Sequence, residues 1–268
     1  MIALKRFGQN FLVDKNILSL IISRAELNPD DRVLEIGPGH GVLTRALLDS
    51  KISCLHSIEL DERLRHELEE LERREKNFKL HWGDAVKFDY DSLTPFPNKV
   101  IANIPYNITT PLIWNLLKFA GQGLNYFLFM LQKEAALRIT AKPDTKERYP
   151  LGVTVEAMGR AVIVKNVSRK CFRPVPEVDS AVVEIKIEKN FDLLKDSSWN
   201  ELLHKGFAHR RKTLINNLKN FKNLTDIKLH EIFDSLKLNE NLRAEDLTCE
   251  EWLKIHEELG QGSGGRHG

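Results

Sequence analysis

An asparagine, a proline and an aromatic ring end an apolar run in the stretch VIANIPYNITTPLIW, residues 100–114. The apolar residues predict a buried strand that stops at Asn103. In the sequence Asn103-Ile104-Pro105-Tyr106, the asparagine oxygen and a nearby backbone carbonyl could accept both N–H bonds of an aminopurine. That would aim the nitrogen lone pair at an electrophile, with Pro105 holding the carbonyls rigid and Tyr106 stacking on the base. A plain turn capped by the asparagine is the alternative.

Three glycines, Gly37, Gly39 and Gly41, follow a predicted strand in VLEIGPGHGVLT and precede a predicted helix. Glycines let the backbone turn sharply and approach a ligand closely. The spacing is G-x-G-x-G, not the G-x-G-x-x-G of dinucleotide sites. Glu59 ends the next strand, where a carboxylate could hold a ribose diol, and Asp84 ends the following one, where it could accept from an exocyclic amine. Acids and glycines at three successive strand ends favour a nucleoside site over ordinary turns.

The elements that must position these residues alternate between short apolar runs and amphipathic stretches. The predicted strands are Arg32–Ile36, Ser53–Glu59, Phe78–His81, Lys99–Ala102, Tyr126–Leu131, Ala161–Val167 and Ser180–Glu188. The predicted helices are Lys15–Ala25, Val42–Asp49, Glu62–Lys76, Pro111–Phe119 and Lys133–Ala141. This rhythm predicts an α/β fold, a mostly parallel seven-stranded sheet covered on both faces. Ligands of such sheets bind beyond the carboxyl ends of the strands.

The pattern becomes purely helical from Ser197 onward, which predicts a domain boundary near residue 190. We therefore expect a catalytic domain over 1–189, a small all-helical domain over 190–259, and a flexible tail over 260–268. Residues 142–150 (KPDTKERYP) predict an exposed, mobile loop.

Composition excludes several classes of protein. No apolar run reaches the roughly 20 residues of a membrane helix, and no early apolar segment resembles a signal peptide. The cysteines, Cys54, Cys171 and Cys249, are too few and too scattered for a disulfide framework or a zinc site, which favours a cytoplasmic protein without a metal. Residues 165–222 hold 13 basic and 7 acidic side chains, whereas residues 223–268 hold 5 and 10. A polyanionic partner would meet the basic segment.

The glycine loop, Glu59 and Asp84 together resemble the class I S-adenosylmethionine-dependent methyltransferases, which have a Rossmann-like fold. In that family the loop lies against the amino-acid part of the cofactor, the first acid binds the ribose, and the second binds the adenine amine. The resemblance implies that Gly37, Gly39, Glu59, Asp84 and Asn103 contact S-adenosyl-L-methionine.

The stretches LKRFGQNFLVDKNIL, IGPGHGVLT, NIPYNITTP, FRPVPEVDSAVV and RRKTLINNL narrow the family further. In this order they resemble the KsgA (RsmA) ribosomal RNA adenine dimethyltransferases over nearly the whole chain. The resemblance adds Asn10 and Leu12 to the cofactor pocket. It implies N6,N6-dimethylation of two adjacent adenosines in the 3′-terminal hairpin loop of 16S rRNA, within an immature 30S subunit. We expect a monomer.

The same resemblance makes Phe172 the second aromatic wall around the target base, opposite Tyr106. On sequence alone, a core phenylalanine at a strand end is an equal alternative. The basic run in HKGFAHRRKTLINNL is interpreted as a helix that docks RNA phosphates. Its cations are Arg210, Arg211 and Lys212, and Lys5 and Arg6 near the N-terminus would extend the same surface. A solvated helix face is the alternative.

Three competing functions remain open. An Erm-type 23S rRNA adenine dimethyltransferase shares the Asn-Ile-Pro-Tyr sequence, but such enzymes usually have serine after the first glycine of the loop, where this chain has Pro38. A largely non-catalytic ribosome-assembly or RNA-binding factor on the same fold would bind the cofactor without methyl transfer. A Rossmann dehydrogenase is disfavoured by the glycine spacing.

Overall fold

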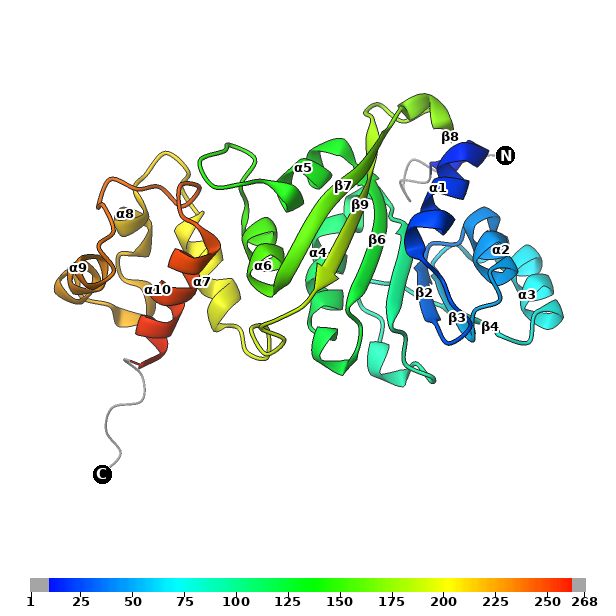
Figure 1. Ribbon diagram of the computed structural model, residues 1–268, viewed down its shortest axis with the longest axis horizontal. Helices are drawn as coiled ribbons and strands as arrows, with labels where there is room; N and C mark the ends of the chain where they lie inside the picture. Colours follow the sequence, from blue (N-terminus) through cyan, green and yellow to red (C-terminus); the bar gives the residue numbers. More distant parts are fainter. Residues whose placement is uncertain (1–9, 262–268) are drawn as a thin grey trace. The chain divides into compact units, whose positions relative to one another are not determined.

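A computed structural model describes residues 10–261 and resolves two compact units (Figure 1). The first contains the chain up to Ala136 together with Ala161–Ile187, and the second contains Leu137–Arg160 and the chain from Glu188. The sequence predicted a single boundary near residue 190. The structure instead assigns residues 137–160 to the mainly helical second unit, because helix α6, Pro150–Met158, packs against helices α7, Ser198–Gly206, and α10, Cys249–Gln261.

The first unit is built on the predicted seven-stranded sheet, in the order β4-β3-β2-β5-β6-β9-β7. The strands are β2 Arg32–Ile36, β3 Cys54–Glu59, β4 Phe78–Trp82, β5 Lys99–Asn103, β6 Tyr126–Gln132, β7 Gly159–Val167 and β9 Ser180–Ile187. The strands from β4 to β6 pair in parallel, and β9 is antiparallel to β6. The mostly parallel α/β sheet expected from the sequence is confirmed.

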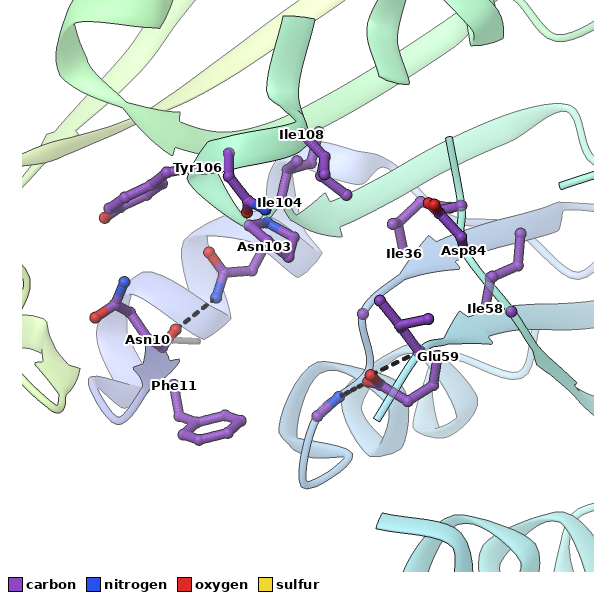
Figure 2. Close-up of a pocket in the computed structure, with 17 residues that line it drawn as sticks. Asn10, Phe11, Ile36, Ile58, Glu59, Asp84, Asn103, Ile104, Tyr106 and Ile108 are labelled. Carbon is purple, nitrogen blue, oxygen red and sulfur yellow. Dashed lines mark hydrogen bonds between the residues drawn. The ribbon is translucent and has the colours of Figure 1, made fainter. Parts of the chain in front are cut away.

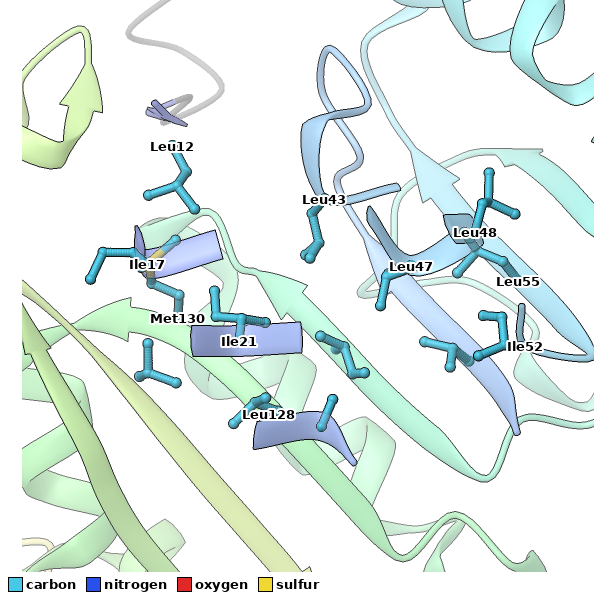
Figure 3. Packing of buried hydrophobic residues seen from close by; sticks show 14 of the residues in the cluster. Leu12, Ile17, Ile21, Leu43, Leu47, Leu48, Ile52, Leu55, Leu128 and Met130 are labelled. Atoms are coloured by element: carbon cyan, nitrogen blue, oxygen red, sulfur yellow. The ribbon is translucent and has the colours of Figure 1, made fainter. Parts of the chain in front are cut away.

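Apolar side chains alternate between the two faces of this sheet, as the two-residue period of a strand requires. One face packs against α1, Lys15–Ala25, and α2, Val42–Asp49, which contribute Ile17, Ile21 and Leu47 to a continuous core (Figure 3). The other helices of this unit are α3 Arg65–Arg74, α4 Thr109–Leu117 and α5 Lys133–Thr140, the last of which continues into the second unit. This packing fixes the strand ends that carry the chemistry.

A second, two-stranded sheet joins distant parts of the chain. Strand β1, Phe11–Leu12, pairs antiparallel with β8, Phe172–Arg173, so that Leu12 lies opposite Phe172. Neither strand was expected from the sequence. Two-residue strands have no periodicity from which they could be recognised.

The second unit contains α6, α7 Ser198–Gly206, α8 Leu214–Leu218, α9 Asp226–Ser235 and α10 Cys249–Gln261. Trp199 and Trp252 are fully buried in it. The loop over 142–150 was predicted to be exposed, but Arg148 is fully buried and donates to the carbonyls of Ala141 (2.9 Å) and Leu247 (3.3 Å). The loop prediction is therefore wrong at Arg148. No helix in the described part of the chain is long and apolar enough to cross a membrane.

Candidate active site

A pocket opens beyond the carboxyl ends of β2, β3, β4 and β5 (Figure 2). This is the place where open parallel sheets bind ligands. Its wall is formed by Asn10, Phe11, Ile36, Gly37, Gly39, Ile58, Glu59, Leu60, Gly83, Asp84, Ala85, Asn103, Ile104, Pro105, Tyr106, Asn107 and Ile108.

The glycine loop needs its glycines for both conformation and space. Gly37 and Gly39 have φ values of +67° and +57°, which L side chains rarely adopt. A Cβ on Gly39 would lie 2.9 Å from the Phe11 ring, so strand β1 covers the loop at close range. A Cβ added to Gly37 would lie 3.8 Å from the ring of Pro105. The loop is thus held between β1 and the segment that follows β5.

Glu59 is buried at the end of β3 and accepts three backbone N–H bonds. Its Oε1 accepts from Leu60 (2.9 Å) and Asp61 (2.8 Å), and its Oε2 accepts from Gly39 (3.1 Å). Burial raises the carboxyl pKa above its ordinary value, although the backbone donors oppose the shift. With one donor on Oε2, the carboxylate keeps acceptor capacity for a hydroxyl in the pocket.

Asp84 lies on the pocket wall after β4, and its Oδ1 accepts from the backbone N–H of Val86 at 2.9 Å. Figure 2 shows Asp84 beside the apolar side chains of Ile36 and Ile58. A flat ring seated against these isoleucines would present its polar edge to the carboxylate. The apolar part of this wall was not expected from the sequence, because buried isoleucines at strand ends look like ordinary core residues.

Asn103 is oriented by the N-terminal segment. Its Nδ2 donates to the backbone carbonyl of Asn10 at 3.1 Å (Figure 2). Because the amide nitrogen is engaged there, the side-chain oxygen is the end left to face a ligand. The following turn is fixed to the sheet, since the Ile104 N–H donates to the Met130 carbonyl at 3.0 Å. The structure therefore brings the four residues Asn103–Tyr106 to the pocket, as predicted.

Tyr106 begins a short 3₁₀ turn, Tyr106–Ile108, and is one of the residues that line the pocket. Its hydroxyl is hydrogen-bonded to the Ser180 hydroxyl at 2.7 Å, and burial raises its pKa above the ordinary value. Tyr106 is therefore a neutral ring at physiological pH, not a general base.

Phe172 does not face the pocket. Its side chain is fully buried within the core cluster that contains Leu12 and Ile17. The geometry does not support the predicted role as a second wall for the base, and the alternative of a core phenylalanine describes it. Leu12 likewise packs into this cluster, and it lines a smaller pocket that shares Phe11, Gly37, Gly39 and Asn103 with the main one.

Glu35 also borders the smaller pocket, behind the glycine loop. It is 1% exposed, and its Oε2 accepts from the hydroxyls of Thr44 (2.8 Å) and Ser57 (2.7 Å). Burial raises its pKa to about 7, and the negative charge of Glu59 adds to the shift. A carboxyl group that is half-ionised near neutrality thus lies beneath the site.

The basic run at residues 210–212, assigned to RNA, is not on a helix. Arg210, Arg211 and Lys212 form the turn between α7 and α8, because the first helix ends at Gly206. The Arg210 guanidinium already has partners within the protein. It forms an ion pair with the Glu245 carboxylate at 3.1 Å and lies over the Tyr149 ring, 4.9 Å from the ring centre. Arg211 and Lys212 are exposed. The other two predicted contacts, Lys5 and Arg6, lie outside the described residues.

Within residues 10–261, no three His, Cys, Asp or Glu side chains are placed to hold a metal ion together.

Comparison with known proteins identifies the class. The profile of the ribosomal RNA adenine dimethylase family matches residues 3–261, so the chain belongs to that family of methyltransferases. It is 37% identical to the ribosomal RNA small subunit methyltransferase A of Malacoplasma penetrans, covering 94% of this chain and 90% of that one. Its identity to the Clostridium acetobutylicum protein of the same name is 38%, with coverage of 95% and 93%. These relatives confirm the KsgA (RsmA) resemblance expected from the motifs.

Two solved structures share the fold over most of the chain. A dimethyladenosine transferase from Plasmodium falciparum superposes with a TM-score of 0.81 at 28% identity, covering 94% of this chain and 98% of that one. The 23S rRNA methyltransferase ErmE superposes with a TM-score of 0.69 at 26% identity, covering 94% and 100%. The α/β methyltransferase fold expected from the sequence is thereby confirmed.

Proposed function

We propose that this protein transfers methyl groups from S-adenosyl-L-methionine to N6 of two adjacent adenosines in the 3′-terminal hairpin loop of 16S rRNA, forming N6,N6-dimethyladenosine. The observation that carries the proposal is the orientation of Asn103, whose nitrogen is held by the Asn10 carbonyl while its oxygen is left for an amine. The relatives named as small-subunit methyltransferases support the choice of 16S rRNA. The partner would be an immature 30S subunit, met in the cytoplasm by a monomer.

The pocket residues fit the proposed cofactor. Glu59 offers an acceptor for a ribose hydroxyl, Asp84 offers one for the adenine amine, and Ile36 and Ile58 provide apolar surface for a purine ring. The glycine loop, with no side chains, admits the amino-acid part close to the backbone. When bound, S-adenosyl-L-methionine would supply an electrophilic methyl group.

The remaining chemistry belongs to Asn103 and its neighbours. The amide oxygen of Asn103 would accept one N–H of the target amine, and the backbone carbonyls of the Ile104–Pro105 turn are the candidates for the second. These bonds favour a pyramidal nitrogen, which regains a usable lone pair. Tyr106 would stack on the base, a contact worth about 1–3 kcal/mol. Positioning then supplies most of the acceleration, and the methylated nitrogen would release its extra proton to solvent, so that a general base is not required.

The target base must leave its stack to reach this pocket. Unstacking costs least where bases are already unpaired, which favours a hairpin loop over a duplex. Exposed Arg211 and Lys212 in the second unit are proposed to contact phosphates, together with Lys5 and Arg6. Arg210 is a weaker candidate, because its guanidinium is already paired with Glu245.

Transfer of labelled methyl to two RNAs tests this function. One substrate is a small subunit that lacks the 3′-loop dimethyladenosines, and the other is protein-free 23S rRNA. Label on the paired loop adenosines of the small subunit, lost in Asn103→Ala while cofactor binding persists, is the expected result. Label on 23S rRNA alone would assign an Erm-type activity. Cofactor binding without label on either RNA would make the protein an assembly factor and refute the proposed role of Asn103.

A further inference from the structure

Tyr106, which lines the pocket, is held by hydrogen bonds both near its backbone and at its hydroxyl. Its backbone belongs to the turn that follows β5, where the Ile108 N–H donates to the Pro105 carbonyl at 3.2 Å. Its phenol oxygen is 2.7 Å from the Ser180 hydroxyl, 74 residues further along the chain. A ring fixed only at its backbone could rotate about its side-chain bonds, and the second tie removes that freedom.

Ser180 is itself held firmly. It is the first residue of β9, is fully buried, and lies opposite Gln132 in the antiparallel pairing with β6. One residue earlier, the Asp179 carbonyl accepts from the Lys133 N–H at 3.0 Å. The serine hydroxyl is therefore a fixed point of the sheet and not a mobile surface group.

The hydrogen bond is also the polar contact that each hydroxyl needs. A buried hydroxyl without a partner costs free energy, so the pair satisfies Tyr106 and Ser180 together. Because the phenol oxygen is hydrogen-bonded to the serine, with either hydroxyl able to donate, this end of the tyrosine is engaged by the sheet. The ring face is what remains for a ligand, which agrees with stacking and not with proton transfer.

We infer that Ser180 is a positioning residue, which holds the Tyr106 ring in the orientation that receives the target base. This inference rests on the proposed function and deepens it. A pre-oriented ring would lower the cost of capturing an unstacked base, because the side chain loses no further freedom when the base arrives. Ser180 would act on RNA binding and base capture, and would leave the binding of the cofactor unchanged.

The test is a double-mutant cycle with Ser180→Ala and Tyr106→Phe, assayed on the under-methylated small subunit. Each single variant removes the same hydrogen bond, and such a bond corresponds to about a threefold to tenfold effect. We expect the KM for RNA to rise by that factor in each single variant, with little change in kcat. The double variant should be no worse than either single one, because the interaction can be lost only once.

Two controls separate positioning from stability. Ser180→Thr keeps a hydroxyl and should retain the wild-type KM. Tyr126→Phe removes another tyrosine hydroxyl, one bonded to the Arg24 carbonyl at 2.9 Å at the start of β6. It should leave the KM for RNA unchanged even if it lowers the melting temperature. Cofactor affinity, measured by calorimetry, should be the same in all variants.

The outcomes distinguish the positioning role of Ser180 from the proposed methyl-transfer function on which it rests. An active wild-type protein with an unchanged KM in Ser180→Ala, or with additive effects in the double variant, would overturn the role of Ser180 alone. A wild-type protein that methylates neither RNA would overturn the proposed function and this inference with it.

Discussion

Glutamine in place of Glu35 should stabilise the protein at alkaline pH but not at acidic pH. The folded protein raises the pKa of this carboxyl from 4.5 to about 7, chiefly by burial. The folded state therefore binds the proton more tightly than the unfolded chain, and stability is lost as pH rises from about 4.5 to about 7. One pKa unit corresponds to about 1.4 kcal/mol, so the ionised carboxylate costs up to about 3 kcal/mol at pH 8.

Glutamine is nearly isosteric and carries no charge. Its side-chain oxygen could still accept from the hydroxyls of Thr44 and Ser57, which both donate to a single oxygen of Glu35. We expect Glu35→Gln to unfold with a free energy about 2–3 kcal/mol higher than the wild type at pH 8, and nearly equal to it at pH 4.5.

Urea unfolding of both proteins across pH 4.5–8 gives the measurement. The quantity to plot is the difference between variant and wild type, because other groups titrate in this range and cancel in the difference. Glu62→Gln, on an exposed side chain, is the matched control, and the effect of Glu35→Gln must exceed the effect of this variant. A Glu35→Gln variant that is no more stable at pH 8, or equally stabilised at both pH values, would refute the argument from burial.

Three further predictions concern single positions. His56 is buried, and burial lowers its pKa to about 4. Its contribution to stability is therefore complete above pH 6.5 and is lost as the pH falls towards 4. An NMR titration that finds His56 protonating near pH 6.5 would contradict this. Gly39→Ala forces a Cβ against Phe11 at positive φ, a strain of about 1–2 kcal/mol, and should weaken cofactor binding by about tenfold in calorimetry while the chain stays folded. In the wild type, the Asn103 amide nitrogen donates to the Asn10 carbonyl at 3.1 Å. Asn103→Asp places a carboxylate oxygen, which repels that carbonyl, in the same position. Single-turnover methyl transfer should then fall by about a hundredfold, and a rate within threefold of wild type would argue against the orientation of this amide.

Strong local patterns were enough to predict much of the first unit. Helix α1 and strand β2 have the predicted bounds, Lys15–Ala25 and Arg32–Ile36. In α1 the apolar period starts after an aspartate, Asp14, whose side chain caps the first turn. Glu59 and Asn103 could be placed because parallel strands end at one edge, which brings their last residues together.

Contacts between distant segments could not be predicted in this way. Phe172 was assigned to the pocket, yet it pairs with Leu12 and its side chain lies in the core. A two-residue strand has no sequence pattern from which its partner could be predicted. Arg210 was assigned to RNA because it belongs to a basic run. Its carboxylate partner, Glu245, is 35 residues away in sequence, and charge counting along the chain does not reveal such a pair.

The pairing of β1 with β8 has a consequence for folding during synthesis on the ribosome. A ribosome making this chain releases the glycine loop and all of the first five strands of the main sheet before it adds Phe172 and Arg173. Until then the segment that carries Asn10 and Phe11 has no strand to pair with. The nascent polypeptide would therefore carry an uncovered, unfinished pocket from the synthesis of its last wall residue, Ile108, until that of β8. The reactive site would close only late in translation, and a product cut short before β8 would have most of the sheet but no lid over the glycines.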